Sequence, residues 1–217
     1  MYSENFKEPV FCFSIDLDWA KEPMIEKTLA IFKEYNVPVT PFITHRSEAI
    51  EAHYKKKPTW VGLHPNFWSD STQGNNCKEI VDSLRKLWPK ALGFRSHRWY
   101  EDLKFSKLFR DNGFLYDSTT CMFLHPNIMP YRCASGLLQF PVFFEDRWFL
   151  SSSWDFRTIL KRLEQPGLKV FDFHPSHVCG DLRVQHFLIR LLKVVNFQRW
   201  KCYSMLDLYR KLRKDED

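Results

Sequence analysis

Short apolar runs alternate with amphipathic segments along most of the chain, and this alternation limits the possible folds more than any other feature. Short apolar runs bounded by turn residues are typical of buried strands, whereas apolar residues spaced three and four apart are typical of helices. We expect strands over residues 10–15, 37–44, 59–63, 91–94 and 168–173, with helices between them. Alternating strands and helices predict an α/β protein with a parallel sheet, closed or nearly closed.

Polar side chains that can bind metals or transfer protons follow the predicted strands. They are Asp16, Asp18, His45, His64, Asn66, Arg95, His97, Asp117, His174 and His177. In barrels of parallel strands the chemistry lies at the carboxyl ends of the strands, which all meet on one face. A single histidine after a strand is more often structural than catalytic. The repetition of Asp, His or Arg at several strand ends indicates a functional site.

The first strand ends in two carboxylates, Asp16 and Asp18, separated only by Leu17. In an extended chain, residues two apart project to the same side and lie roughly 6–7 Å apart. Two like charges this close resist ionising together unless a cation or an arginine compensates. The pair therefore favours a metal site, in which one carboxylate is a ligand and the other accepts a proton. The alternative is an ordinary strand end that enters a solvated loop.

The composition excludes several other classes of protein. The 217 residues carry a net charge of +6 without a basic stripe, which argues against nucleic-acid binding. Six scattered cysteines form no C-x-x-C pair, no apolar run reaches transmembrane length, and the first residues lack a signal core. We therefore expect a reduced, cytoplasmic protein with one domain over residues 1–217. Its rhythm of strands and helices is interrupted by an insertion around residues 121–150.

Five segments carry the polar residues in a fixed order: S-I-D-L-D, G-L-H-P-N-F, F-R-S-H, G-F-L-Y-D-S and F-D-F-H-P-S-H. Together they resemble the motifs of NodB-type polysaccharide deacetylases, carbohydrate esterase family 4, and in particular a small branch met in surface-polysaccharide gene clusters. The resemblance implies a distorted (β/α) barrel of about seven parallel strands. It also implies metal-dependent hydrolysis of an N-acetyl group from a sugar.

The resemblance also implies roles for individual residues. Asp16 would be the general base held by Arg95, His174 the general acid, and Asp18 and His64 ligands of a divalent metal, zinc. Phe171 and Phe173 would shape an apolar pocket for the acetyl methyl group. The remaining expected substrate contacts are Asn66, Trp68 and His177.

The sequence departs from the family pattern at one metal ligand. The family has a second histidine four residues after the first, and this chain has Trp68 there. A catalytic zinc site needs three protein ligands and an open position. We expect His97 to be the third ligand, with His45 and His177 as the alternatives.

The expected substrate is an N-acetylated sugar linked to a nucleotide or a lipid, since a protein without a signal peptide meets precursors and not finished polymers. Two other functions remain open. One is a metal-dependent amidohydrolase acting on another small N-acyl or cyclic amide substrate. The other is a catalytically degenerate sugar-binding domain, which Trp68 favours. The retained Asp16, Arg95 and His174 favour a hydrolase, because binding alone needs no acid and base.

Overall fold

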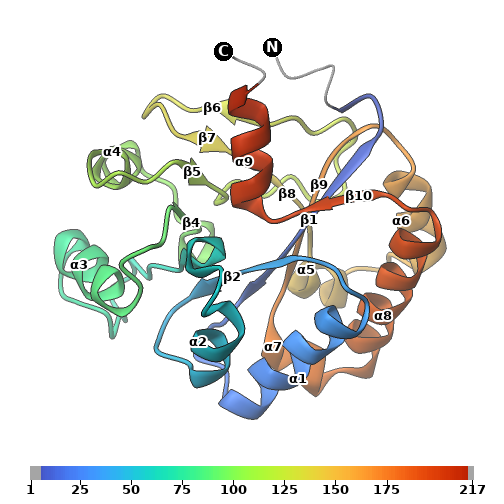
Figure 1. The fold of residues 1–217 in the computed structure, drawn as a ribbon, viewed down its shortest axis with the longest axis horizontal. Coiled ribbons are helices and arrows are strands. Elements are labelled where there is room, and N and C mark those ends of the chain that lie inside the picture. The colour runs from blue at the N-terminus through green and yellow to red at the C-terminus, as the bar shows by residue number, and fades with distance from the viewer. Residues whose placement is uncertain (1–5, 215–217) are drawn as a thin grey trace.

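The computed structural model describes residues 6–214, which form a curled sheet surrounded by helices (Figure 1). Seven parallel strands follow the order β5-β4-β3-β2-β1-β9-β8. Their bounds are β1 (Pro9–Asp16), β2 (Val39–Ile43), β3 (Gly62–Leu63), β4 (Gly93–Phe94), β5 (Tyr116–Asp117), β8 (Val142–Glu145) and β9 (Gly167–Phe173). A parallel bridge between Cys121 and Val142 joins the two sides of the curled sheet. The predicted distorted (β/α) barrel of about seven parallel strands is confirmed.

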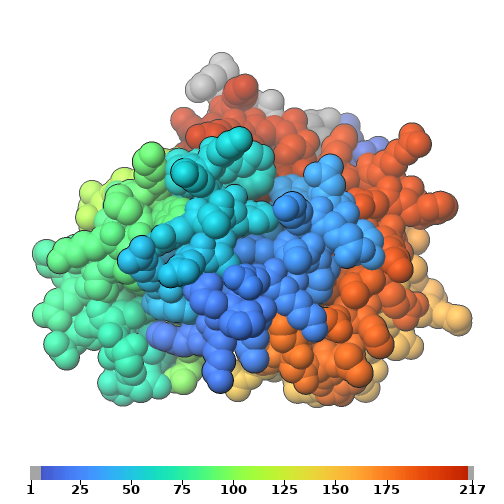
Figure 2. Space-filling model, turned by 60° about the horizontal axis from the view of Figure 1, so that its bottom comes forward, coloured from blue at the N-terminus to red at the C-terminus, as the bar shows by residue number. Residues whose placement is uncertain are grey.

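Helices cover the outside of this sheet, and three short strands extend it. The helices are α1 (Glu22–Glu34), α2 (Glu48–Tyr54), α3 (Cys77–Leu87), α4 (Leu103–Asp111), α5 (Asp146–Ser151), α6 (Phe156–Leu163), α7 (Pro175–Gly180), α8 (Leu182–Phe197) and α9 (Met205–Lys214). The added strands are β6 (Tyr131–Arg132), β7 (Leu138–Gln139) and β10 (Lys201–Tyr203). Figure 2 shows the blue and cyan N-terminal segments beside the orange and red C-terminal ones on one face.

Central strand β1 separates two environments by the alternation of its side chains. Phe13 faces outward and packs against Phe32 of α1, with ring centroids 5.8 Å apart. Ser14 faces inward, where its hydroxyl accepts a hydrogen bond of 2.8 Å from Arg95. Successive residues of a strand point to opposite faces, so Asp16 shares the inner face with Ser14. The barrel interior is therefore polar at the end where β1 stops.

The same alternation in β9 corrects one expectation. Asp172 is the residue that faces inward, and its carboxylate lies 2.7 Å from Arg95 Nη1. Phe171 and Phe173 face outward, where both are fully buried and Phe173 lies 6.4 Å from the ring of Phe187 on α8. The structure therefore does not bring Phe171 and Phe173 to the site, and they do not form the expected acetyl pocket.

Two regions differ locally from their predicted structure. Residues 58–60 form a 3-10 turn, in which the amide of Trp60 bonds to the main-chain oxygen of Lys57. Pro58 favours this turn because it has no N–H to donate to a neighbouring strand. The strand predicted over 59–63 therefore shortens to β3. Within residues 121–150, β6 and β7 form an antiparallel pair that continues the sheet beyond β5, whereas β8 pairs in parallel with β9 as a strand of the barrel. The single domain over residues 1–217 stays a prediction, since that range includes residues outside the described ones.

No helix between residues 6 and 214 is long and apolar enough to cross a bilayer. The cytoplasmic location stays a prediction.

Candidate active site

A cavity of about 720 Å³ lies at the carboxyl ends of the strands. Its lining comes from the ends of β1, β3, β4, β8 and β9 and from the start of α5 and α7. Of the residues predicted for the site, it contains Asp16, Asp18, His64, His97, His174 and His177. Residues distant in the sequence thus meet at one end of the barrel, as the positions of the polar residues after the strands predict.

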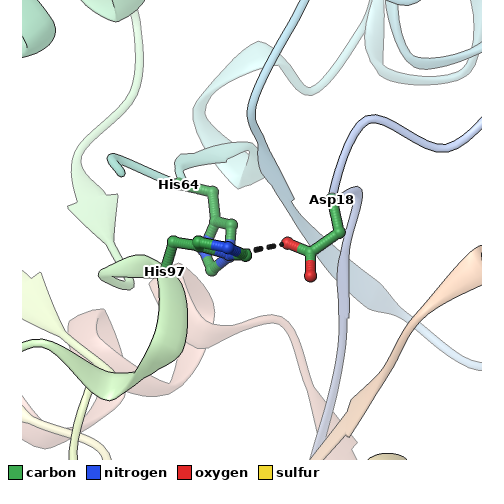
Figure 3. A group of neighbouring side chains, drawn as sticks. All are labelled: Asp18, His64 and His97. Atoms are coloured by element: carbon green, nitrogen blue, oxygen red, sulfur yellow. Dashed lines mark hydrogen bonds and ion pairs between the residues drawn. The ribbon is translucent and has the colours of Figure 1, made fainter. Parts of the chain in front are cut away.

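Asp18, His64 and His97 point toward one another from three separate segments (Figure 3). Asp18 Oδ1 lies 3.1 Å from both His64 Nε2 and His97 Nδ1, and these two nitrogens are 3.3 Å apart. Burial alone would raise the pKa of Asp18, but hydrogen bonds to the two imidazoles outweigh it and lower the pKa well below its usual range. Asp18 is therefore a carboxylate at neutral pH.

The tautomer of His64 indicates that a cation fits this cluster. His64 Nδ1 lies 2.7 Å from the main-chain oxygen of Arg95, which can only accept, so Nδ1 carries the hydrogen. In the neutral ring, Nε2 then presents a lone pair to the carboxylate of Asp18. Lone pairs that face each other at this distance need a proton or a metal ion between them. One carboxylate and two imidazoles suit a divalent transition metal, and a main-chain carbonyl orienting the ring is a common support for such a ligand.

The other histidines considered as third ligands lie elsewhere. His45 Nδ1 bonds to the hydroxyl of Thr44 at 2.8 Å, outside the cluster. His177 Nδ1 lies 2.9 Å from Asp146 Oδ1 and belongs to a second group of side chains in the cavity. Of the three candidates, the structure brings only His97 to Asp18 and His64.

Asn66 and Trp68 do not reach the cavity, contrary to the expectation that they contact the substrate. Trp68 is 43% exposed and packs edge-on against Tyr100. The side-chain oxygen of Asn66 accepts a bond of 3.0 Å from the amide of Trp68, and its nitrogen donates to Asp70. Gln73 fixes this loop, because it accepts from the amide of Asn66 and donates to the main-chain oxygen of His64.

Asp16 is held by an arginine that is fully buried. Arg95 Nη1 lies 2.9 Å from Asp16 Oδ1, while Nε and Nη2 donate to the main-chain oxygen and the hydroxyl of Ser118. Burial opposes the charged form of Arg95, but the carboxylates of Asp16 and Asp172 raise its pKa above the usual value. Arg95 therefore stays charged and fixes the orientation of the Asp16 carboxylate.

Asp172 is a partner of Arg95 that sequence reasoning missed. It is fully buried, and its Oδ2 has no hydrogen-bond partner. Burial raises the pKa of Asp172 well above its usual value, and the positive charge of Arg95 opposes this shift. The available signal was a charged residue in the middle of the apolar run over residues 168–173.

His174 is paired with a second carboxylate that the sequence did not identify, Asp146. His174 Nδ1 lies 2.7 Å from Asp146 Oδ1, and the amide of His174 donates to Asp146 Oδ2 at 2.7 Å. Burial would lower the pKa of His174, but Asp146 raises it well above its usual value. The opposite ring nitrogen of His174 lies 3.5 Å from Asp18 Oδ2. A protonated imidazole therefore faces the cavity.

Comparison with known proteins identifies the family. The sequence profile of the WbmS-like polysaccharide deacetylases matches residues 13–186. The chain belongs to this family. A search of curated proteins found no match to this sequence.

Solved structures of polysaccharide deacetylases share the fold. A candidate polysaccharide deacetylase involved in O-antigen biosynthesis from Bordetella bronchiseptica is 24% identical, with a TM-score of 0.68 over 86% of this chain and 85% of that one. A second, from Mycobacterium smegmatis, is 20% identical, with a TM-score of 0.63 over 97% and 92% of the two chains. A family 4 carbohydrate esterase from Streptomyces lividans is 10% identical, with a TM-score of 0.55 over 91% and 92%.

Proposed function

We propose that this polysaccharide-deacetylase family member hydrolyses the N-acetyl group of a nucleotide-linked or lipid-linked sugar precursor. Asp18, His64 and His97 would hold a divalent ion, zinc. The supporting observation is that a buried carboxylate, a set of metal donors and an imidazole with a raised pKa meet in one cavity. A pure binding domain has no need of such an arrangement.

Asp16 and His174 divide the proton transfers of the hydrolysis. Asp16 accepts the proton of the water that attacks the acetamide carbonyl, and Arg95 keeps the receiving oxygens in place. His174 then donates its proton to the nitrogen that leaves. A bound divalent ion would polarise the carbonyl and make the attacking water more acidic. The products are acetate and an amino sugar.

The assignment of His97 as a ligand can be tested without measuring activity. In a crystal structure of the zinc-loaded protein, we expect His97 Nδ1 about 2.0–2.1 Å from the ion, as for other imidazole ligands. His97→Ala should weaken zinc binding measured by competition with a chelating dye. His45→Ala is the control, because His45 bonds to Thr44 outside the cluster. Zinc affinity equal in wild type and His97→Ala would contradict the assignment.

Replacing Asp146 should change the pH profile of the reaction. Because Asp146 raises the pKa of His174, the wild-type acid stays protonated well above the usual range for histidine. In Asp146→Asn that support is lost, so the alkaline limb of the rate profile should move to lower pH. Activity should then fall more at pH values of about 8 than at about 6.

Asp155→Asn is a suitable control for that experiment. It makes the same change at an exposed residue that caps α6, and asparagine caps helices equally well. The two variants are compared through kcat/KM over the pH range. An alkaline limb that is unchanged in Asp146→Asn would remove His174 from the role of acid.

The proposed function itself is tested by acetate release from N-acetylated sugars in free, nucleotide-linked and lipid-linked form. Zinc-loaded wild-type protein should release acetate from at least one of the linked forms. If the loaded protein releases none from any form, the catalytically degenerate sugar-binding domain becomes the better account.

A further inference from the structure

Two arginines line the catalytic cavity beside the acid and base groups. Arg147 lies in the first turn of α5, and Arg98 follows β4. Arg98 forms an ion pair of 3.2 Å with Asp70, so part of its charge is already compensated. Between residues 6 and 214, Arg147 has no ion-pair partner, and its side chain is exposed. Arg147 thus offers an uncompensated guanidinium at the edge of the cavity.

Asp146, which directly precedes Arg147 in the chain, is engaged with His174 and His177 at 2.7 and 2.9 Å. The next acidic residue, Glu145, is occupied in another way. It also lines the cavity, but it is buried and caps α5 by accepting a bond of 2.8 Å from the amide of Trp148. The carboxylates of both neighbours are therefore engaged, and the side chain of Arg147 is available to a ligand. Guanidinium groups match carboxylates and phosphates in geometry, because both can be bound through two parallel hydrogen bonds.

Backbone conformation gives a second reason to regard this rim as a ligand contact. Arg98 and Trp99 have φ values of 55° and 56°, in the left-handed region that bulky side chains rarely adopt. Such residues persist where the surrounding structure enforces them, and they concentrate at ligand-binding positions. Both side chains line the cavity.

Trp148 supplies an apolar surface next to the free arginine. It lines the cavity and is 52% exposed, although large apolar side chains are normally buried. Exposed apolar surface beside a cavity marks ligand contacts, and a flat indole can pack against the apolar face of a sugar ring. A sugar ring packed against Trp148 would have its ring substituents close to Arg147.

We propose that the sugar carries an oxyanion, a ring carboxylate or a phosphate, and that Arg147 binds it while Trp148 packs against the ring. Arg98 is the second, weaker contact to the anion. The inference rests on the proposed function and names the substrate class of the same site. It makes Arg147 a specificity-determining residue, which a neutral N-acetyl sugar would leave without a partner.

The test is binding to Asp16→Asn protein, in which turnover does not disturb the measurement. Calorimetry compares neutral N-acetylhexosamines of gluco and galacto configuration with their C6 uronic acids and their uridine-diphosphate derivatives. We expect at least one anionic class to bind about 10- to 100-fold more tightly than the neutral sugars, as for a hydrogen bond to a charged group. The uronic acids and the diphosphates separate the two sources of the anion.

Further substitutions assign the preference to Arg147. Arg147→Gln should remove it without weakening the neutral sugars, and Arg147→Lys should restore part of it. Arg157→Gln is the matched control, because Arg157 is an exposed arginine on α6 that does not line the cavity. It should leave the preference unchanged.

The outcomes separate this inference from the proposed function. The inference would be overturned if neutral sugars bind as tightly as both anionic classes, or if the anionic preference survives in Arg147→Gln. Either result would overturn it even if wild-type protein releases acetate from some of these sugars. An anionic preference that depends on Arg147 supports it even if no sugar is deacetylated, in which case the proposed function fails.

Discussion

Asp16→Asn should lower the rate of deacetylation by about 10²- to 10⁴-fold, the usual loss when a general base is removed. The asparagine keeps the shape of the side chain and can still accept the bond of 2.9 Å from Arg95 Nη1. It cannot take a proton from water, however. Because Asp16 is not one of the three proposed ligands, the zinc content measured by elemental analysis should stay at the wild-type level.

Asp172→Asn is the matched control for this experiment. Asp172 is also buried and also lies within hydrogen-bond distance of Arg95 Nη1, but it does not line the cavity. The same substitution there should cost much less activity. Equal losses in the two variants would indicate that Asp16 acts only by holding Arg95, and a wild-type rate in Asp16→Asn would remove it from the chemistry.

Removing a proposed metal ligand should have the second large effect. His64→Ala and Asp18→Gly should each weaken zinc binding by more than about 100-fold, since substitution of residues that merely support ligands already costs 10- to 100-fold. Acetate release at limiting zinc should fall with it. Glycine is chosen at position 18 because Asp18 has a φ of 43°, which glycine adopts without strain.

Two controls separate loss of zinc from loss of structure. The far-ultraviolet circular dichroism of each variant should match that of wild type, and His45→Ala should keep its zinc. Full zinc occupancy in His64→Ala and Asp18→Gly at limiting metal would show that the ion binds elsewhere, for example at the group formed by Asp146, His174 and His177.

The position of the site could be predicted from the sequence because most of the polar side chains involved lie at or just after the end of a strand. Asp16 ends β1, Arg95 follows β4 and His174 follows β9, and parallel strands bring these ends together. The position of His97 at the site could be predicted in the same way, since His97 comes just after Arg95. The order of strands and helices was therefore sufficient to predict which end of the barrel holds the site.

Partners that depend on packing between distant segments could not be predicted. Asp146 precedes His174 by 28 residues and lies at the end of an aromatic run whose appearance suggested an insertion. In β9, alternation indicates that Phe171 and Phe173 share one face and Asp172 the other. It does not indicate which face is turned inward, and a charged residue that pairs with a buried arginine decided it.

The direction of the loop after His64 is the other feature that could not be predicted from the sequence. The position four residues after His64 holds a ligand only if the chain continues as a regular turn toward the cavity. Gln73 instead ties the loop to the main-chain oxygens of Thr44 and His64, which turns Trp68 toward Tyr100. Such side-chain to main-chain bonds leave no periodic pattern.

Acetate release before and after removal of metal tests most directly the proposal that this chain is a metal-dependent N-deacetylase. Protein stripped with a chelator and then dialysed should release no acetate from a linked N-acetyl sugar that the zinc-loaded protein deacetylates. Addition of one equivalent of zinc should restore the rate, but only in protein that retains His97. Undiminished acetate release by the stripped protein would contradict the account.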